Sequence, residues 1–440
     1  MHPRSLLVDL YEAAVAGAAP GPLTASALRD VDVPAGARIW VYALGKAAHA
    51  MTASAVTELE RSLHTIAGGV LVAPEAAATP HATVAAMVGD HPLPGRHSFA
   101  AARRIGESSK AKRGDDVAVV LVSGGASSLA AAPLDGLAEQ DLVALFELLL
   151  RSGLDVRPMN AVRKRFMRWG GGRLAVALAP ARTHVLVMSD VIGDDPADVG
   201  SGPCSPDRHT AREVIDILER AAILRDIPAA MRDHLTAVSR GIVPETPKPS
   251  HPAFAHVATR VIGTNRLAVD TAARRARALG LRAEVVDTPL AGEASHCGAA
   301  IAESLLARAE AGEELCVVWG GETTVQLGGD ESALAPGGRC QELALAAARR
   351  LARGGEAARR VTLLAAGTDG RDGPTDAAGA FADASLWDEI ARSGHDPERA
   401  LARHEAYTAL DAVGGLMRRG QTGTNVMDVV IGMVKREHGP

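Results

Sequence analysis

The sequence predicts an α/β fold with more than one domain, and three observations support that prediction. Apolar runs of strand length repeatedly end in loops rich in glycine and carboxylate, and alanine-rich amphipathic segments follow these loops. The chain has 440 residues, which favours two or three domains. Residues 241–252, GIVPETPKPSHP, concentrate proline and lack apolar periodicity, so they form the best linker candidate. We therefore expect one domain over residues 1–245 and a second over residues 253–440.

In the first half, the apolar runs at residues 38–44, 68–73, 117–122 and 183–191 predict strands. Helices are expected from residue 47 to about residue 63 and from residue 137 to residue 151. A polar and basic segment follows the second helix. Its clustered cations, which could bind a small anion, are Arg163, Lys164, Arg165 and Arg168.

The second half repeats this pattern at residues 261–287, 315–321 and 361–370. The run VTLLAA at 361–366 reads as a central parallel strand, because such strands are buried on both faces. Ligands of parallel sheets bind beyond the carboxyl ends of the strands, where Asp369, Asp372 and Asp376 would lie. The apolar run at 424–434 predicts a last strand in either domain.

Composition and charge exclude several functional classes. Hydrophobic residues make up 47% of the chain and charged residues 22%, which is typical of a globular enzyme. An aromatic content of 3% and a net charge of -5 disfavour nucleic-acid binding. The four cysteines are too scattered for a disulfide framework or a thiolate zinc site. Asp9 and Glu12 interrupt the N-terminal apolar stretch, and no run could span a bilayer, so we expect a cytoplasmic protein without a membrane partner.

Two loops of the first half have groups suited to binding phosphate. Lys46 follows a strand and precedes a helix, where its ammonium could meet an anion held by free backbone N–H groups. The loop SGGASS, Ser123 to Ser128, offers N–H groups and hydroxyls at another helix start. The alternatives are a surface lysine and a simple tight turn.

Two further loops have charged groups that suit metal or anion binding. Asp190 and Asp194 lie in the acidic loop SDVIGDDPAD, and carboxylates at that density suit Mg²⁺ held together with substrate phosphates, although helix capping and turn formation explain some of them. Arg339 precedes a helix and could contact a carboxylate or phosphate with two N–H groups, or pair with a neighbouring acid. Beside it, Cys340 occupies a helix start, where a thiol can acquire a lowered pKa and become reactive.

Several standard catalytic signatures are missing from the sequence. The Gly45–Lys46 pair lacks the Walker spacing, and no GxGxxG lies between a strand and a helix. There is no GxSxG elbow and no HExxH pair, and His91, His97 and His296 have no ligand spacing. These absences disfavour a P-loop enzyme, a nicotinamide-dependent enzyme, a triad hydrolase and a zinc enzyme.

The loops occur in an order that is similar to a known family. From the N-terminus the motifs are GKAA, GDHPLPG, SGGASS with APLDG, NAVRK, SDVIGDD with SGP, GTNRLA, GGETTV, GGR-x-QE, GTDGRDGPTDAAG and GTN. This series, from about Lys46 to Asn425, resembles the class II glycerate 2-kinases with a MOFRL domain, which have also been called hydroxypyruvate reductases. The resemblance implies a Rossmann-like αβα N-terminal domain, a smaller α/β C-terminal domain and an active site in the cleft between them.

The resemblance also implies an activity and its residues. The expected reaction is ATP-dependent phosphorylation of D-glycerate, or a close 2-hydroxy acid, at the 2-hydroxyl, with Mg²⁺ as the metal. Lys46 and Arg339 would be the catalytic cations, while Asp190 would orient the attacking hydroxyl or hold Mg²⁺ with Asp194. The residues expected to bind the nucleotide are Ser123, Gly124, Gly125, Ser127, Ser128, Gly320, Gly321, Glu322, Gly367, Asp369 and Asn425.

At three positions the sequence departs from the family pattern, so it predicts the fold more firmly than the substrate. Cys340 replaces an asparagine, Arg165 stands where a histidine is common, and Met427 replaces an asparagine. Cys340 and Met427 leave a catalytically silent ligand-binding relative as one alternative. An NAD(P)H-dependent hydroxypyruvate reductase is the other, because it would share the α/β class and a small anionic substrate. The sequence determines neither the exact hydroxy acid, nor the 2- or 3-phosphate as product, nor the oligomeric state, for which a homodimer is an open option.

Overall fold

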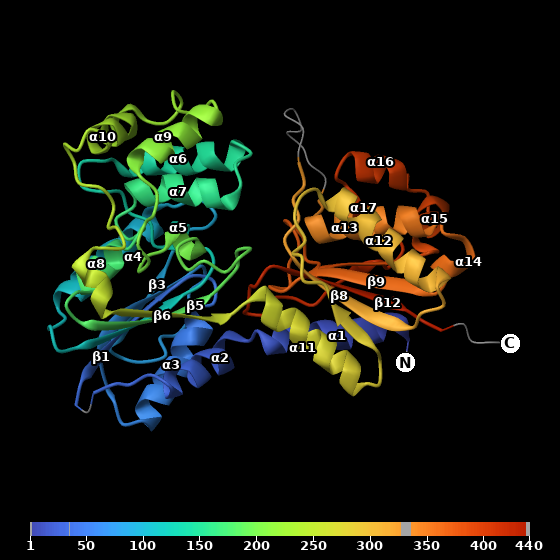
Figure 1. Cartoon of the computed structure of the whole chain (residues 1–440), viewed down its shortest axis with the longest axis horizontal. Coiled ribbons are helices and arrows are strands. Elements are labelled where there is room, and N and C mark those ends of the chain that lie inside the picture. The colour runs from blue at the N-terminus through green and yellow to red at the C-terminus, as the bar shows by residue number, and fades with distance from the viewer. Residues whose placement is uncertain (1, 35, 327–335, 437–440) are drawn as a thin grey trace. The chain divides into compact units, whose positions relative to one another are not determined.

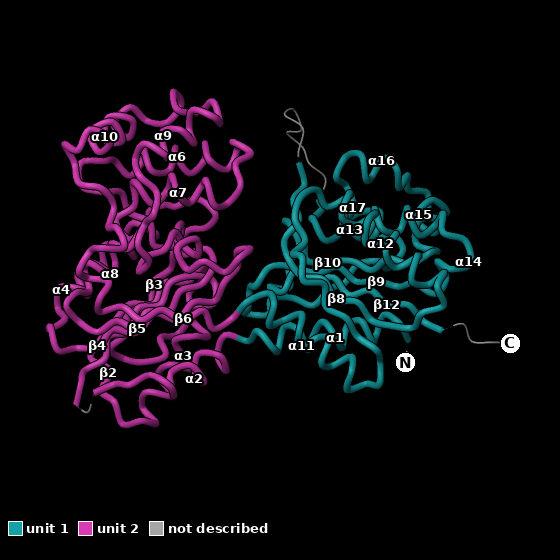
Figure 2. Tube along the Cα trace, viewed as in Figure 1, with its two compact units in different colours: residues 1–19, 264–440 teal, residues 20–263 magenta. Residues whose placement is uncertain are grey.

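The computed structural model describes residues 2–34, 36–326 and 336–436. Internal contacts divide the chain into two compact units, which Figure 2 shows in separate colours. Unit 1 combines residues 1–19 with residues 264–440, and unit 2 comprises residues 20–263. In the described part of the chain, no helix is both long enough and apolar enough to cross a membrane.

Unit 2 is built on a parallel sheet, which among the described residues has six strands (Figure 1). All neighbouring strands pair in parallel, and the central strands read as continuous apolar runs because helices cover both faces. In spatial order the strands are β3 (Val84–Val88), β2 (Thr65–Ala73), β1 (Arg38–Leu44), β4 (Val117–Val122), β5 (Arg182–Met188) and β6 (Val257–Gly263).

Helices cover the sheet of unit 2 on both faces. On one face, α4 (Arg96–Lys110) and α8 (Arg173–Leu178) pack against Trp40 and Tyr42 of β1. On the other face lie α2 (Pro20–Arg29) and α3 (Ala48–Arg61).

Further helices of unit 2 form a second apolar cluster around Phe146 and Phe166. They are α6 (Glu139–Arg151), α7 (Val156–Phe166), α9 (Ala211–Arg220) and α10 (Ala229–Ser239). The short elements of this unit are α5 (Ala126–Leu129), η1 (Val199–Ser201) and η2 (Pro252–His256).

Unit 1 is built on a mixed sheet, with six strands among the described residues. In spatial order they are β11 (Leu416–Met417), β10 (Gly379–Asp383), β9 (Val361–Gly367), β12 (Asp428–Val434), β8 (Leu315–Gly321) and β7 (Ala283–Val285). The prediction that residues 361–366 form a parallel strand was wrong, because β9 pairs antiparallel with both β10 and β12. A strand buried on both faces has the same apolar pattern in either direction, so the sequence alone did not distinguish the two.

Two groups of helices cover the sheet of unit 1 (Figure 1). One face carries α1 (Pro3–Gly17) and α11 (Asn265–Ala278). The other elements are α12 (Ala294–Glu310), α13 (Arg339–Leu351), α14 (Gly355–Ala358), α15 (Leu386–Arg392), α16 (Pro397–Ala402) and α17 (Ala406–Asp411). The buried helix α13 packs against α12, β9 and β10.

The two units differ from the predicted domains, 1–245 and 253–440, at two places. Residues 241–252 are hydrogen-bonded into unit 2, for example from the Thr246 hydroxyl to the Asp207 carboxylate at 3.0 Å, and β6 then completes the parallel sheet. Helix α1 lies in unit 1, where the hydroxyl of buried Tyr11 donates a 2.7 Å hydrogen bond to the Gly367 carbonyl. Both connections are between residues distant in sequence, so no local pattern marks them.

We predict that Tyr11→Phe destabilises unit 1, because the buried Gly367 carbonyl would lose this hydrogen bond. Because the Gly370 N–H still donates to this carbonyl at 3.1 Å, the expected loss is about 0.5–1.5 kcal/mol of unfolding free energy, measured by urea denaturation. Tyr407→Phe is the matched control, since that hydroxyl bonds Asp376 at an exposed position and should change stability by less than about 0.5 kcal/mol. Equal effects of the two substitutions would show that α1 is not anchored in this way.

Candidate active site

In unit 2 the strand order reverses between β1 and β4, which is where ligands bind in open α/β sheets. The loops after these strands are hydrogen-bonded to each other. The N–H of Lys46 donates to the Gly124 carbonyl at 2.9 Å, and the N–H of Ser123 donates to the Leu44 carbonyl at 2.9 Å. The predicted GKAA and SGGASS motifs therefore form one structure at the carboxyl edge of the sheet.

Glycines allow three loops to approach closely at this edge. A Cβ on Gly124 would lie 1.8 Å from Oδ2 of Asp190, which follows β5. A Cβ on Gly125 would lie 3.1 Å from the His91 ring and 3.4 Å from Cγ of Lys46. The structure thus brings together the predicted residues Lys46 and Asp190, and adds His91.

The electrostatics of this cluster are unusual. Burial raises the pKa of Asp190, while the charge of Lys46 acts in the opposite direction. Burial and the charges of Lys46 and Arg163 lower the pKa of His91 to about 4, so its imidazole is neutral near pH 7. A carboxylate that holds its proton more tightly than usual, beside an exposed ammonium, suits acceptance of a proton from a hydroxyl.

The serines of SGGASS use their hydroxyls within the protein. Ser123 Oγ accepts a hydrogen bond from the Ala47 N–H at 3.0 Å, which fixes the start of α3. Ser127 Oγ lies 2.7 Å from Ser201 Oγ, and Ser128 Oγ donates to the Gly125 carbonyl at 3.2 Å. These hydroxyls hold the loop in shape, so nucleotide binding by SGGASS would rely on its backbone groups.

The carboxylates of the acidic loop after β5 have different contacts. Asp195 and Asp198 pair with arginines or lysines, at 3.3 Å to Arg208 and 3.4 Å to Lys164. Asp194 adopts a left-handed conformation, and its buried Oδ1 has no partner. Within residues 2–34, 36–326 and 336–436, no group of three or more His, Cys, Asp or Glu side chains is placed to hold a metal ion. The assignment of Mg²⁺ to Asp190 and Asp194 therefore stays a prediction.

In unit 1 the strand directions bring several predicted residues to one edge. Asp428, the first residue of β12, is opposite Gly321 at the end of β8 and Gly367 at the end of β9. Because β12 runs antiparallel to both strands, its start meets their ends. Glu322 and Asp369, which follow β8 and β9, therefore belong to the same edge as Asp428.

Arg339 is held at this edge by two carboxylates. Its Nε and Nη2 contact the two oxygens of Asp428 at 2.6 and 2.8 Å, and its Nη1 lies 3.0 Å from Glu322. Burial opposes the charge of Arg339, but the Asp428 carboxylate outweighs it, so the pKa of Arg339 is raised. Two of the five guanidinium N–H groups have no partner among residues 2–34, 36–326 and 336–436.

Asp372 fixes the start of α13 and thereby the position of Arg339. Its carboxylate accepts hydrogen bonds from the N–H groups of Cys340 at 3.1 Å and Gln341 at 2.8 Å, as a capping residue would. The space for this carboxylate exists because residue 338 is glycine, whose Cβ would lie 2.3 Å from Asp372 Cγ. The same burial, together with the nearby Asp428, raises the pKa of Asp372 to about 7.

The structure contradicts the prediction that Cys340 is reactive. Its side chain is buried in the apolar core of unit 1. Burial, with the nearby carboxylates of Asp428 and Asp372, raises the pKa of the Cys340 thiol well above its ordinary value. A helix start lowers a thiol pKa only where solvent reaches the thiol, and here desolvation dominates.

The remaining predicted residues of unit 1 have mainly structural contacts. A Cβ on Gly320 would lie 1.7 Å from Asn265 Oδ1, and the amide of Asn265 donates to the Asp428 carbonyl at 2.9 Å. Asp369 Oδ1 accepts from the Arg371 N–H at 3.0 Å, and Asn425 Oδ1 accepts from the Met427 N–H at 3.3 Å.

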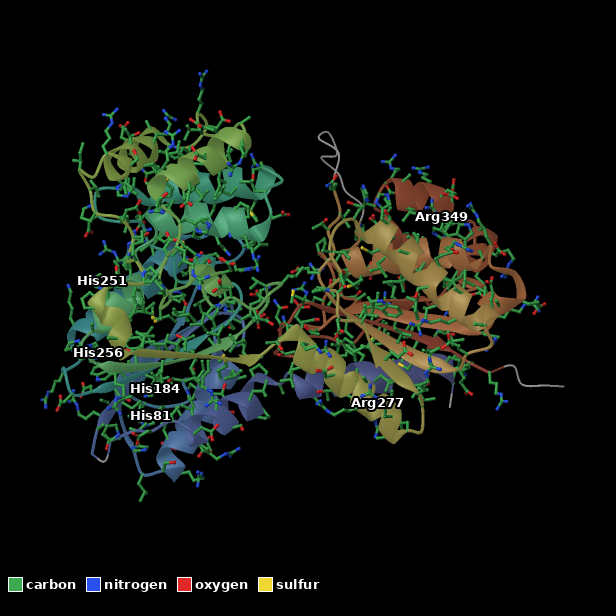
Figure 3. The ribbon with its side chains drawn as sticks, in the orientation of Figure 1. His81, His184, His251, His256, Arg277 and Arg349 are labelled. Carbon is green, nitrogen blue, oxygen red and sulfur yellow. The ribbon has the colours of Figure 1, made fainter. Side chains whose placement is uncertain are left out.

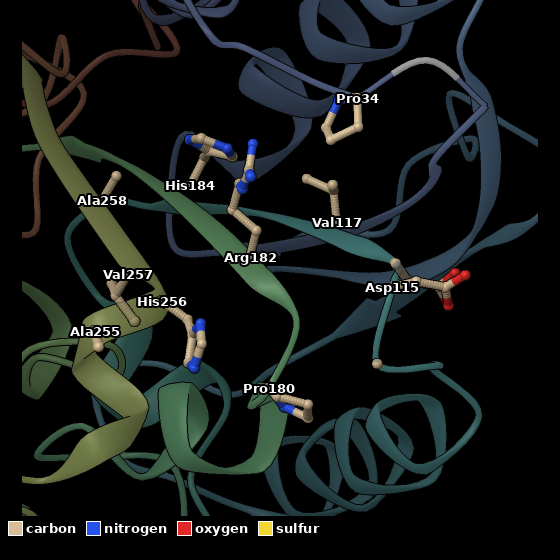
Figure 4. A pocket seen from close by; sticks show the side chains of 12 residues that line it. Pro34, Asp115, Val117, Pro180, Arg182, His184, Ala255, His256, Val257 and Ala258 are labelled. Carbon is tan, nitrogen blue, oxygen red and sulfur yellow. The ribbon is translucent and has the colours of Figure 1, made fainter.

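A cavity of about 500 Å³ lies elsewhere in unit 2, at the amino ends of β4, β5 and β6. Figure 4 shows Arg182, His184 and His256 among its lining residues, and Figure 3 places the two histidines in the whole chain. This edge of the sheet is opposite the one that carries Lys46 and Asp190. The cavity is therefore separate from the candidate active site.

Comparison with known proteins assigns the family. One family model, described as a domain of unknown function (DUF4147), matches residues 6–236, and the MOFRL family model matches residues 315–428. The glycerate 2-kinase of Pyrococcus horikoshii is 34% identical over 406 residues, which cover 91% of this chain and 88% of that protein. The chain belongs to the glycerate 2-kinase family.

A second relative and a solved structure, both from Thermotoga maritima, support this conclusion. The D-glycerate 2-kinase of Thermotoga maritima is 36% identical over 349 residues, which cover 78% of each chain. The crystal structure of a glycerate kinase from Thermotoga maritima aligns with a TM-score of 0.82 and 32% identity, covering 98% of this chain and 99% of that one. The resemblance and the α/β fold predicted from the sequence are thus confirmed.

The sequence reasoning missed three residues of the two clusters. His91 lies in the motif GDHPLPG, and Asp428 immediately follows the departure at Met427. Asp372 was named only as part of an acidic loop. Each of these residues acts through contacts with segments that are distant in sequence. In the sequence, only its position within a motif of the family could have indicated its importance.

We predict that Asp372 makes stability depend on pH. Its folded pKa of about 7 exceeds the ordinary 3.8, so the folded state binds the proton more tightly. The stability that this proton contributes is complete below about pH 4 and is lost as the pH rises through 7. The difference in melting temperature between wild type and Asp372→Asn should therefore be larger at pH 5 than at pH 8.

Asp376→Asn is the control for this experiment. Hydrogen bonds from Tyr407 and Arg418 lower the pKa of this exposed carboxyl, so the substitution should produce no such loss between pH 5 and pH 8. A pH-independent difference for Asp372→Asn would contradict the raised pKa.

Proposed function

We propose that this protein transfers the γ-phosphoryl group of ATP to the 2-hydroxyl of D-glycerate, giving 2-phosphoglycerate and ADP. In this step the bond from the γ-phosphorus to the bridging oxygen breaks, a bond to the substrate oxygen forms, and the hydroxyl proton leaves. The observation that carries the proposal is that the loops of Lys46 and Asp190 come together at the switch point of the unit 2 sheet, where the charge of Lys46 acts on the Asp190 carboxyl, in a member of this family.

Asp190 and Lys46 have complementary roles in the proposed reaction. Asp190, whose pKa is raised by burial, accepts the proton of the attacking hydroxyl. Lys46 is exposed and forms no ion pair with a described residue, so its charge is available to the migrating phosphoryl group. Phosphoryl transfer depends mainly on such positioning and charge neutralisation.

Arg339, in unit 1, is part of the proposal as the second catalytic cation, through the guanidinium N–H groups that have no partner among the described residues. These would contact phosphate oxygens, while Asp428 and Glu322 hold the guanidinium in one orientation. The nucleotide-binding role of Gly320, Gly321, Gly367, Asp369 and Asn425 remains part of this proposal.

Mg²⁺ is assigned to the nucleotide rather than to a site made by the protein alone. This ion commonly keeps several waters and binds through one or two carboxylates plus substrate phosphates. Asp190 and Asp194 are the carboxylates of the loop after β5 that fit this description, because neither pairs with an arginine or lysine among the described residues, whereas Asp195 and Asp198 do. When bound, the metal would neutralise phosphate charge.

The product formed from ATP, Mg²⁺ and D-glycerate tests the proposed function. Phosphorus NMR should show the resonance of 2-phosphoglycerate together with ADP, and excess chelator should abolish turnover. The absence of any phosphoglycerate would contradict the kinase. Oxidation of NADH by hydroxypyruvate in the same preparation would instead support a reductase.

Substitution of the two cations should separate catalysis from stability. We expect Lys46→Met to lower kcat on the order of 100-fold or more, with no change in melting temperature, because Lys46 supports no ion pair in the described structure. Arg339→Leu should lower both kcat and melting temperature, since it leaves the buried Asp428 carboxylate without its partner. Near wild-type turnover in Lys46→Met would remove that residue from the mechanism.

A further inference from the structure

Arg163 of α7 has an unusual environment within the basic segment NAVRKR. Its three cationic neighbours all form ion pairs, Lys164 with Asp198, Arg165 with Glu245 and Arg168 with Asp135. Arg163 forms none with a described residue, and its buried Nε has no hydrogen-bond partner. Desolvation of an unpaired charge is costly, so a guanidinium retained in this state is suited to an anionic ligand.

Packing fixes where the Arg163 side chain lies. Its guanidinium carbon is 4.4 Å from the centre of the Phe146 ring, which holds the planar group against α6. Burial lowers the pKa of Arg163 to about 10, which still leaves it fully charged at neutral pH. The side chain is therefore ordered and cationic without a carboxylate partner.

A chain of hydrogen bonds connects this face of α7 to the candidate active site. Asn160 lies one turn before Arg163, on the same face of the helix. Ser201 Oγ donates to Asn160 Oδ1 at 3.3 Å and lies 2.7 Å from Ser127 Oγ in the SGGASS loop. The face of α7 that carries Arg163 is thus anchored to the loop that packs against Lys46.

His91 provides a second connection between Arg163 and the site. Both Arg163 and Lys46 act electrostatically on the His91 imidazole, which lies against Gly125. The neutral imidazole leaves the positive charge of this region to the two long side chains. Two cations that act on the same neutral imidazole form a suitable environment for an oxyanion.

Resting on the proposed function, we propose that Arg163 binds an oxyanion of a substrate, with Lys46 and His91 as the neighbouring groups. The planar guanidinium presents parallel N–H groups that match either a carboxylate or a phosphate. The two sources are the carboxylate of the 2-hydroxy acid and a phosphate of the nucleotide. Arg163 is then a substrate-binding residue that fixes the position of the reacting groups.

Steady-state kinetics of Arg163→Ala and Arg163→Lys test this assignment. We expect Arg163→Ala to reduce kcat/KM on the order of 100-fold, and Arg163→Lys to lose less, because it keeps the charge but not the planar fork. Dissolved guanidinium at millimolar concentration should partly restore Arg163→Ala by occupying the vacated space beside Phe146. A raised KM for D-glycerate alone identifies the carboxylate, and a raised KM for ATP alone identifies the phosphate.

Arg168→Ala is the matched control, since this arginine lies close by in sequence and pairs with the exposed Asp135. It should leave kcat/KM unchanged. Unaltered kcat/KM in Arg163→Ala overturns the inference, as does a loss that guanidinium does not restore and that accompanies a lowered melting temperature. If the wild type forms no phosphoglycerate, the proposed function fails, but calorimetric titration with D-glycerate, ATP and inorganic phosphate still decides the inference. At least one of these ligands should bind Arg163→Ala more weakly than wild type, and equal affinities for all three would overturn the inference.

Discussion

The candidate active site depends on the close approach of Gly124 and Asp190. The Asp190 carboxylate occupies the space where any other residue at position 124 would place its Cβ, 1.8 Å from Oδ2. This contact places a partly desolvated carboxylate beside Lys46, and the desolvation is what raises the pKa of Asp190. The raised pKa of Asp190 thus depends on the absence of a side chain at Gly124.

In unit 1, too, glycines leave room for polar side chains of other segments. The missing side chain of Gly338 admits the Asp372 carboxylate to the start of α13, and that of Gly320 admits the Asn265 amide to the start of β12. Together these contacts hold Arg339 and Asp428 at the edge where three strands meet. In both units glycine brings a polar side chain of one loop into the backbone of another.

The sequence could predict features that depend on local pattern. Apolar runs and helical periodicity are local, and they predicted the α/β class, the strand β1 and the loops that carry Lys46 and Asp190. Strand direction is not local, so β9 was taken as parallel although both of its neighbours are antiparallel. The placement of α1 in unit 1 depends on a hydrogen bond between Tyr11 and Gly367, 356 positions apart.

The sequence also did not reveal which charged side chains form ion pairs with each other. Arg339 was expected either to contact a ligand or to pair with a neighbouring acid, and the structure shows contacts with two carboxylates, one of which lies 89 positions away. Nothing in the sequence favoured Arg163 over its neighbours Lys164, Arg165 and Arg168 as the residue that binds an anion. The structure shows that, among the described residues, the three neighbours form ion pairs and Arg163 does not. Whether a charged side chain has an ion-pair partner depends on segments that are distant in sequence. Residue type alone therefore does not show whether a charge is available to a ligand.

The turnover of Gly124→Ala tests the central claim most directly, because the added methyl group must displace the Asp190 carboxylate. The account predicts a fall in kcat on the order of 100-fold with D-glycerate and ATP. Gly114→Ala is the control: its Cβ would lie 3.4 Å from Pro180, an ordinary contact at the other edge of the sheet, and kcat should not change. Wild-type turnover in Gly124→Ala would contradict the account.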